Sequence, residues 1–138
     1  MADRVRKIQY CTCEVPTRPG QAAGALGALA EVGVDLLAFT GFPIGGGRAQ
    51  LDFAATRLAG VRRVARREGW RLSRPKRAFL IQGGDRVGAV HQHVARLASA
   101  RINVTALDAV TAGSGRYGVI LWVKPRDYAR AARALGAR

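Results

Sequence analysis

An internal repeat with an offset of 68 residues is the strongest constraint on how this chain can fold. When the sequence is shifted by 68 positions without a gap, residues 18–54 meet residues 86–122 with eight identities, where this composition gives roughly three by chance. Matches of chemical kind extend the similarity, and Val34-Asp35-Leu36 lies on Ile102-Asn103-Val104. The chain is therefore a tandem duplication, and one pattern of elements must be built twice.

Each half of the duplication predicts a strand, a helix, a hairpin of two strands and a second helix. Apolar residues at i, i+3, i+4 spacing indicate the helices, and glycine-rich turns that suit positive φ indicate the hairpins. Only the first half has sequence left for a closing strand. The expected elements of the two halves are first strands at 8–15 and 78–82, helical stripes Leu26/Leu29/Ala30 and Val94/Leu97/Ala98 that end near Gly33 and Arg101, hairpins 34–42 with 49–56 and 102–110 with 117–124, second helices at 61–68 and 128–135, and one closing strand at 70–73.

The order β-α-β-β-α-β is the ferredoxin-like split unit. We therefore predict an α+β protein of two ferredoxin-like repeats, residues 1–75 and 76–138, each an antiparallel sheet with helices on one face. The second repeat lacks its last strand, which leaves the edge of 78–82 unpaired, and proteins seldom tolerate such an edge. Val119–Val123 is apolar on both sides, so the other half or a partner chain should cover the second face. Both features predict a homodimer.

The charge is strongly positive, with 23 Lys+Arg against 9 Asp+Glu and a formal net charge of +14. Such an excess attracts nucleic acid, anionic membrane or acidic ligands. Only three of the basic residues are Lys, and Ala and Gly are abundant. This composition is typical of a gene rich in G and C, in which Arg fills solvated positions whatever the partner, and we favour this explanation of the charge. No apolar run approaches the roughly 18 residues of a membrane helix, and no apolar signal core follows Met1, so we expect a cytoplasmic protein.

Catalytic and metal chemistry find little support in the sequence. His91 and His93 are two positions apart on a predicted helix and project about 200° from each other, so they cannot chelate one metal ion from that helix. Cys11 and Cys13 share a strand face, and no second ligand pair exists elsewhere, which favours buried core thiols. We expect no catalytic residue, no metal and no cofactor.

Short motifs in both halves resemble the ACT domain. The second half has the segment Gly84-Asp85-Arg86-Val87-Gly88-Ala89-Val90, followed by Leu97-Ala98 and Arg101-Ile102-Asn103-Val104. In ACT domains a D-R-x-G turn joins the first strand to the first helix, and an N-I or N-V pair opens the second strand. The first half carries a weaker copy in Thr17-Arg18-Pro19-Gly20 and Val34-Asp35-Leu36. The resemblance covers nearly the whole chain, as a stand-alone protein of two ACT repeats.

This resemblance implies a non-catalytic regulatory module that binds a small ligand, commonly an amino acid, where two domains meet. The turn exposes backbone N–H groups at a helix N-terminus, which suits a carboxylate, and a glycine there allows close approach. Asn103 offers both donors and an acceptor to an amino acid. The predicted ligand contacts are Asp85, Arg86, Val87, Gly88, Ile102, Asn103 and Val104, with Arg18, Pro19, Gly20 and Asp35 from the weaker copy.

Structural roles compete with these assignments. Gly20 and Gly88 can simply serve their turns, Asp85 can cap the helix that follows, and Asn103 can be a turn residue that enters a strand. Asp35 replaces the Asn of the motif, and its carboxylate would repel a ligand carboxylate while holding an ammonium group. The sequence names neither the ligand nor a regulated enzyme or regulator.

An RNA-binding protein is the alternative. Ala78–Gln82 and Arg116–Val123 resemble the first-strand and third-strand motifs of RNA-recognition-motif domains, which use the same element order. The basic charge is compatible with this reading. However, Val119 stands at the central stacking position, where an aromatic ring contributes roughly 1–3 kcal/mol per base.

Overall fold

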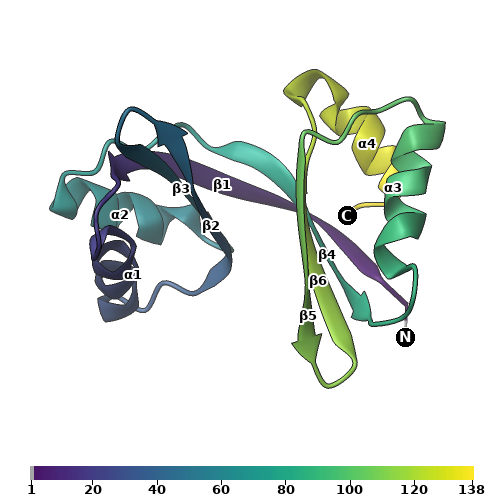
Figure 1. The fold of residues 1–138 in the computed structure, drawn as a ribbon, viewed down its shortest axis with the longest axis horizontal. Coiled ribbons are helices and arrows are strands. Elements are labelled where there is room, and N and C mark those ends of the chain that lie inside the picture. Colours follow the sequence, from purple (N-terminus) through teal and green to yellow (C-terminus); the bar gives the residue numbers. More distant parts are fainter. Residues whose placement is uncertain (1) are drawn as a thin grey trace. The chain divides into compact units, whose positions relative to one another are not determined.

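The computed structural model describes residues 2–138 and contains the duplicated order of elements (Figure 1). The α+β fold with ferredoxin-like repeats is confirmed. The elements of the first half are β1 (Arg4–Pro16), α1 (Gln21–Glu31), β2 (Leu36–Gly45), β3 (Arg48–Ala55) and α2 (Leu58–Glu68). Those of the second half are β4 (Lys76–Gly84), α3 (Ala89–Ser99), β5 (Ala106–Gly113), β6 (Arg116–Trp122), a short 3-10 turn (Pro125–Asp127) and α4 (Tyr128–Leu135).

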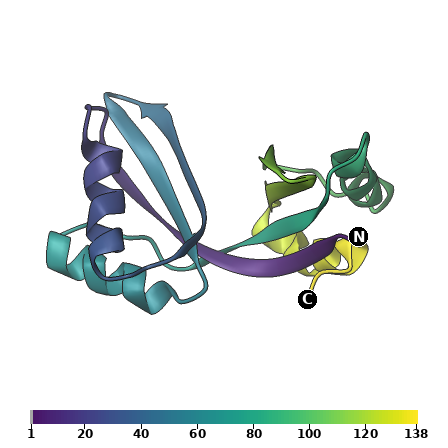
Figure 2. The same ribbon diagram turned by 90° about the horizontal axis from the view of Figure 1, so that it is seen from below.

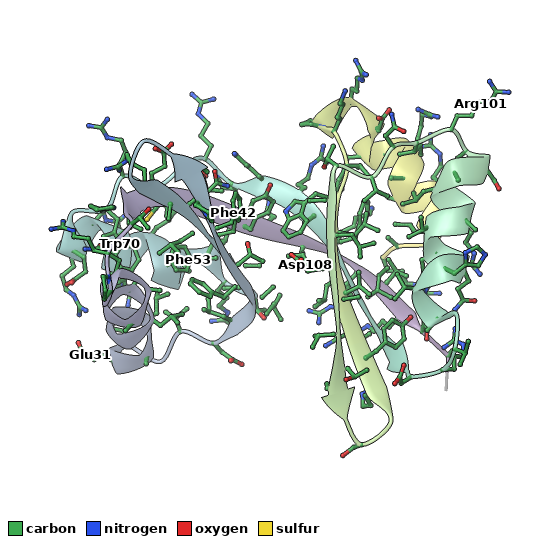
Figure 3. The ribbon with its side chains drawn as sticks, viewed as in Figure 1. Glu31, Phe42, Phe53, Trp70, Arg101 and Asp108 are labelled. Carbon is green, nitrogen blue, oxygen red and sulfur yellow. The ribbon has the colours of Figure 1, made fainter. Side chains whose placement is uncertain are left out.

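Backbone conformation repeats with the same offset of 68 residues as the sequence. Helices α1 and α3 correspond residue for residue, and both begin after a glycine in the left-handed region, Gly20 (φ 90°) and Gly88 (φ 82°). Both are followed by a second left-handed residue, Gly33 (φ 72°) and Arg101 (φ 59°). Figure 3 shows Arg101 beyond the end of α3. The duplication is thus visible in the turns as well as in the elements.

The hydrogen-bonded order of the strands is β2-β3-β1-β4-β6-β5. The chain forms two compact units: the first-repeat unit is Gln9–Lys76, and the second-repeat unit combines Arg77–Arg138 with the residues up to Ile8. In the first-repeat unit α1 and α2 lie on one face of the strands, and α3 and α4 do so in the second-repeat unit (Figures 1 and 2). The boundary between residues 75 and 76 stays a prediction about the sequence repeats, because β1 contributes to both units.

The beginning of β1 pairs with the edge of β4 that the sequence analysis predicted to be unpaired. Residues 4–8 of β1 belong to the second-repeat unit, where β1 lies next to β4 (Figure 1). The backbone N–H of Arg138 donates to the carbonyl of Val5, and the N–H of Lys7 donates to the carbonyl of Arg138. The expectation that β4 has an unpaired edge is therefore wrong, and this argument for a homodimer falls with it.

The closing segment of the first repeat forms a single bridge rather than a strand. Leu72 pairs with Cys13 in an isolated antiparallel bridge, and the N–H of Ser73 donates to the carbonyl of Thr12. Trp70, at the start of this segment, stacks on Phe53 with ring centroids 5.6 Å apart (Figure 3). The segment predicted as a closing strand thus lies beside β1 and forms an isolated bridge there rather than a strand.

The helical stripes are displaced from the prediction at four of six positions. Leu29 and Leu97 are fully buried, as expected, but the other core-facing residues are Ala25 and Ala28 in α1 and Ala89 and His93 in α3. Leu26, which we placed in the stripe, is 36% exposed. The correction matters because it turns His93 toward the core of the second-repeat unit.

Apolar burial is found on both faces of the second-repeat sheet. Val119, Leu121 and Val123 pack in the helix-side core, and Ile120 on the opposite face is buried as well. The alternation of β6 explains why Val119–Val123 is apolar throughout. Cys11 and Cys13 are buried in the core of the first-repeat unit as free thiols, as predicted.

Candidate functional site

The turn between β4 and α3 forms one wall of a pocket of about 250 Å³. Asp85, Arg86 and Gly88 line it from the turn, and the first residues of α3 continue the wall. The remaining lining comes from β5 and from Tyr117 at the start of β6. The pocket therefore lies at a helix N-terminus, where the helix dipole favours negative charge.

Gly88 occupies the N-cap position of α3, and no side chain of the described residues caps that helix. The interpretation of Asp85 as a helix cap is therefore wrong. The backbone N–H of Asp85 donates instead to the carbonyl of Gly115, 2.8 Å away, which ties the turn to the β5–β6 hairpin. The equivalent bond in the first-repeat unit runs from Thr17 to Gly47.

The other predicted contacts lie apart from this turn within each unit. Ile102 is buried in the core, Val104 packs against the core, and Asn103 is exposed in the loop after α3. Since α3 has 11 residues, this loop lies about 16 Å from the turn. Val87 is fully exposed beside the pocket. In the first-repeat unit, Arg18, Pro19 and Gly20 are exposed before α1, and Asp35 is exposed before β2.

A buried carboxylate that the sequence analysis did not single out lies beside the pocket. The side chain of Asp3 is only 7% exposed and accepts hydrogen bonds from five donor atoms on four residues. The donors are Oη of Tyr117 at 2.5 Å, Nε2 of His93 at 2.7 Å, Nε2 of Gln92 at 3.0 Å, and Nη1 and Nη2 of Arg86 at 3.2 Å each. We call these four residues the carboxylate cradle.

The cradle stabilises the ionised form of Asp3. Burial alone would raise the pKa of Asp3, but hydrogen bonds from Tyr117, His93 and Arg86, together with the positive charge of Arg86, outweigh it. The pKa of Asp3 falls from 3.8 to about 2. Burial, the hydrogen bond to Asp3 and the negative charge of Asp3 all raise the pKa of Tyr117, to about 12. At neutral pH the phenol is therefore a donor to a carboxylate.

His93 completes the cradle from the core side of α3. Its side chain is almost fully buried, and Nε2 must carry a hydrogen because an ionised carboxylate can only accept. Its other ring nitrogen, Nδ1, has no hydrogen-bond partner among residues 2–138. A buried nitrogen without a partner costs stability, so the position of His93 is imposed by its bond to Asp3.

Gly83 makes room for the carboxylate. A Cβ atom at residue 83 would clash with the side chain of Asp3, and the backbone φ of Gly83 is not in the left-handed region. The glycine is thus required by close approach rather than by a turn. Arg86 contributes further order, because its Nη1 also donates to the carbonyl of Gly84 at 2.9 Å.

Arg86 and Tyr117 belong to both the pocket and the cradle. The sequence analysis identified Arg86 by its motif but missed Asp3, Gln92, His93 and Tyr117. The three missed donors are 89 to 114 positions from Asp3, and no local pattern connects them to it. One signal was available in the sequence. If the helical stripe is shifted by one residue toward the N-terminus, His93 faces the core, where a histidine needs a hydrogen-bond partner.

The remaining chemical groups behave as separate features. His91 is exposed at the pocket whereas His93 is buried, so the two rings diverge as predicted. Within the described part of the chain, no group of three or more His, Cys, Asp or Glu side chains is placed to hold a metal ion. Among the helices of residues 2–138, none combines the length and the apolar character needed to cross a membrane.

Two aromatic residues of the RNA-recognition-like motifs, Phe79 and Tyr117, do not contribute to a stacking platform. Phe79 and Tyr117 are buried in the helix-side core, and Phe79 stacks on Tyr128 with centroids 4.4 Å apart. Base stacking requires an exposed ring on the open face of the sheet. These two rings point away from that face.

Comparison with known proteins shows the fold. No protein-family model and no curated protein matches the sequence. Among solved structures, the chain is similar to protein BT0572 from Bacteroides thetaiotaomicron, with a TM-score of 0.78 and 12% identity over 97% of this chain and 88% of that one. It is also similar to the ligand-free regulatory subunit of aspartate kinase from Thermus thermophilus (TM-score 0.62, 20% identity, 98% and 93% covered) and to that from Thermus flavus (0.61, 21%, 98% and 94%). At these identities the likeness shows a shared fold.

Proposed function

We propose that this chain is a non-catalytic regulatory protein that binds a small ligand, an amino acid, at the turn before α3. The observation that carries the proposal is the pocket at that turn, because the D-R-x-G residues Asp85, Arg86 and Gly88 line it together. The fold adds support, since two of the structures it resembles are regulatory subunits of aspartate kinase.

The pocket suits the carboxylate of an amino acid on physical grounds. The N-terminal end of α3 carries partial positive charge, Arg86 lines the pocket with a side chain that stays 44% exposed beside its ion pair with Asp3, and Gly88 leaves the backbone accessible. Val90, Ala109 and Val110 supply apolar surface for a side chain. Asn103 and Asp35 remain predicted contacts in an arrangement where a second domain completes the site. Ligand binding would act by linkage, stabilising one arrangement of the protein that a partner enzyme or regulator recognises.

A thermal-shift screen of the twenty amino acids tests the proposal. A ligand at 100 times its dissociation constant adds about 2.7 kcal/mol of stability. The variant Thr111→Trp should abolish the response because residue 111 lines the pocket, whereas Ala112→Trp on the same strand should retain it. The proposal fails if no amino acid shifts the melting temperature of the wild-type chain. Binding of single-stranded RNA with a steep salt dependence in the same samples would instead support the alternative function.

The cytoplasmic location and the homodimer are further parts of the proposal. Strands β2 and β5 are the two ends of the strand order, and edges of this kind pair readily with another chain. Light scattering at micromolar concentration measures the oligomeric state directly. A mass of 14.7 kDa alone would remove the homodimer from the proposal.

A further inference from the structure

We infer that the carboxylate cradle is itself a ligand-binding site, which the chain fills with its own Asp3, and that an external carboxylate competes with Asp3 for it. The cradle residues are Arg86, Gln92, His93 and Tyr117. Asp3 then acts as an internal ligand, and its displacement frees the start of β1.

The cradle has the chemistry of a carboxylate receptor. The two terminal nitrogens of Arg86 each bond a different oxygen of Asp3, the fork geometry by which arginine recognises carboxylates. Neutral donors from α3 and β6 surround the same group, and the carboxylate is almost fully removed from solvent. The same donors could bind the carboxylate of a separate molecule, because they contact the carboxylate group alone.

The occupant is held by a segment that can separate from the cradle. Asp3 precedes β1, and the part of β1 in this unit is an added strand whose sequence lies far from the rest of the second repeat. The side chain of Arg86 is 44% exposed, so solvent reaches part of it even while Asp3 is bound. The pocket shares Arg86 and Tyr117 with the cradle, which gives an external ligand a route to both residues.

Competition would connect ligand binding to the rest of the protein through β1. Residues 4–8 of β1 belong to the second-repeat unit and residues 9–16 to the first-repeat unit. A ligand that replaces Asp3 loosens the start of a strand that both units use. The apparent affinity of the wild-type chain is then reduced by the fraction of molecules whose cradle is filled by Asp3. The identity of an amino acid as ligand rests on the proposed function, whereas the cradle can be tested with simple carboxylates.

The test is chemical rescue in the full chain at pH 7. Asp3→Ala empties the cradle and should lower the melting temperature by roughly 5–10 °C in sodium chloride. Sodium acetate at the same ionic strength should restore it in a saturable manner. At ten times its dissociation constant, acetate raises the folding equilibrium constant about 11-fold, or roughly 4 °C. If Asp3→Ala does not fold in chloride, recovery of its circular dichroism spectrum in acetate is the same measurement.

Matched variants separate a specific site from a salt effect. Asp3→Asn keeps the cradle filled with a carboxamide and should show no acetate response, and the double variant Asp3→Ala/Arg86→Ala should lose the response. Any amino acid that binds the wild-type chain should bind Asp3→Ala at least tenfold more tightly. Equal melting temperatures of Asp3→Ala in acetate and chloride overturn the inference and leave the proposed function standing. Acetate rescue without any amino-acid response overturns the proposed function alone.

Discussion

Arg18 and Arg86 occupy equivalent positions before α1 and α3, yet their surroundings differ completely. Arg86 holds the carboxylate of Asp3 together with three other residues of the cradle. In the first repeat, the positions equivalent to the other three cradle residues carry no polar side chain that could bind a carboxylate. The equivalent pairs are Gln92 with Gly24, His93 with Ala25, Tyr117 with Ala49 and Gly83 with Val15. The carboxylate cradle therefore belongs to the second repeat, and the equivalent positions of the first repeat cannot form one.

Each unit also has a buried carboxylate, and the two are satisfied differently. Asp52 in the first-repeat unit accepts from neutral groups, Oγ1 of Thr40 at 3.1 Å and Nε2 of Gln50 at 2.9 Å. Asp3 in the second-repeat unit accepts from a guanidinium group as well as from neutral donors. The contrast is that a positively charged group balances the buried carboxylate of the second-repeat unit, whereas neutral donors satisfy that of the first-repeat unit.

Equivalent core substitutions give the largest expected effects and test whether the units are equally stable. Leu29→Ala and Leu97→Ala remove the most buried leucines of α1 and α3, and each should cost about 3 kcal/mol of stability. Native-state hydrogen exchange should report faster opening in the unit that carries the substitution. Leu26→Ala, at an exposed position of α1, is the control and should cost less than half as much. Uniform acceleration across both units after either substitution would show a single cooperative unit instead.

Acid should destabilise the second-repeat unit selectively. The pKa of Asp3 is lowered to about 2 in the folded protein, so the stability from its ionisation is complete above pH 4 and is lost as the pH falls from 4 to 2. The loss amounts to about 2 kcal/mol. Urea unfolding at a series of pH values measures it, and Asp3→Asn should show a flatter profile over this range. An identical pH profile for wild type and Asp3→Asn would contradict the predicted contribution.

Two tyrosines compare a charged acceptor with a neutral one inside the same unit. Tyr117→Phe removes a bond to a carboxylate and should cost about 2 kcal/mol, whereas Tyr128→Phe removes a bond to the carbonyl of Ala78 and should cost about 1 kcal/mol. Urea titrations of the three proteins give the comparison. Equal losses would mean that Asp3 contributes no more than a backbone carbonyl.

The smallest expected effects lie at the residues that end α1 and α3. Arg101 is left-handed at φ 59° where the first repeat has Gly33, so Arg101→Gly relieves strain and should stabilise by about 0.5 kcal/mol. Gly33→Ala should destabilise by about 1 kcal/mol through the backbone alone, because a Cβ there meets no atom within 4 Å. Thermal unfolding of both variants checks the opposite signs. Destabilisation by both would indicate a contact of Arg101 that outweighs its backbone strain.

The internal repeat predicted the fold well, because the fold depends on the order of the elements along the chain and on their apolar periodicity. The offset of 68 residues placed two helices and one hairpin in each repeat, and the glycine-rich turns proved left-handed. The stripe was misplaced because alanine is common on every face of α1, so an apolar pattern could not distinguish Ala25 from Leu26. The cradle could not be predicted, since it depends on residue 3 reaching β6 through a strand that belongs to both units.

The shared strand has a consequence for how this duplication can be taken apart. A gene fragment that encodes residues 76–138 contains the second repeat as the sequence defines it, yet it omits the strand beside β4 and the carboxylate beside α3. Such a truncation exposes a bare β edge that can recruit a strand from any neighbouring molecule. The boundary between the sequence repeats and the boundary between the folded units therefore lie at different places in the chain.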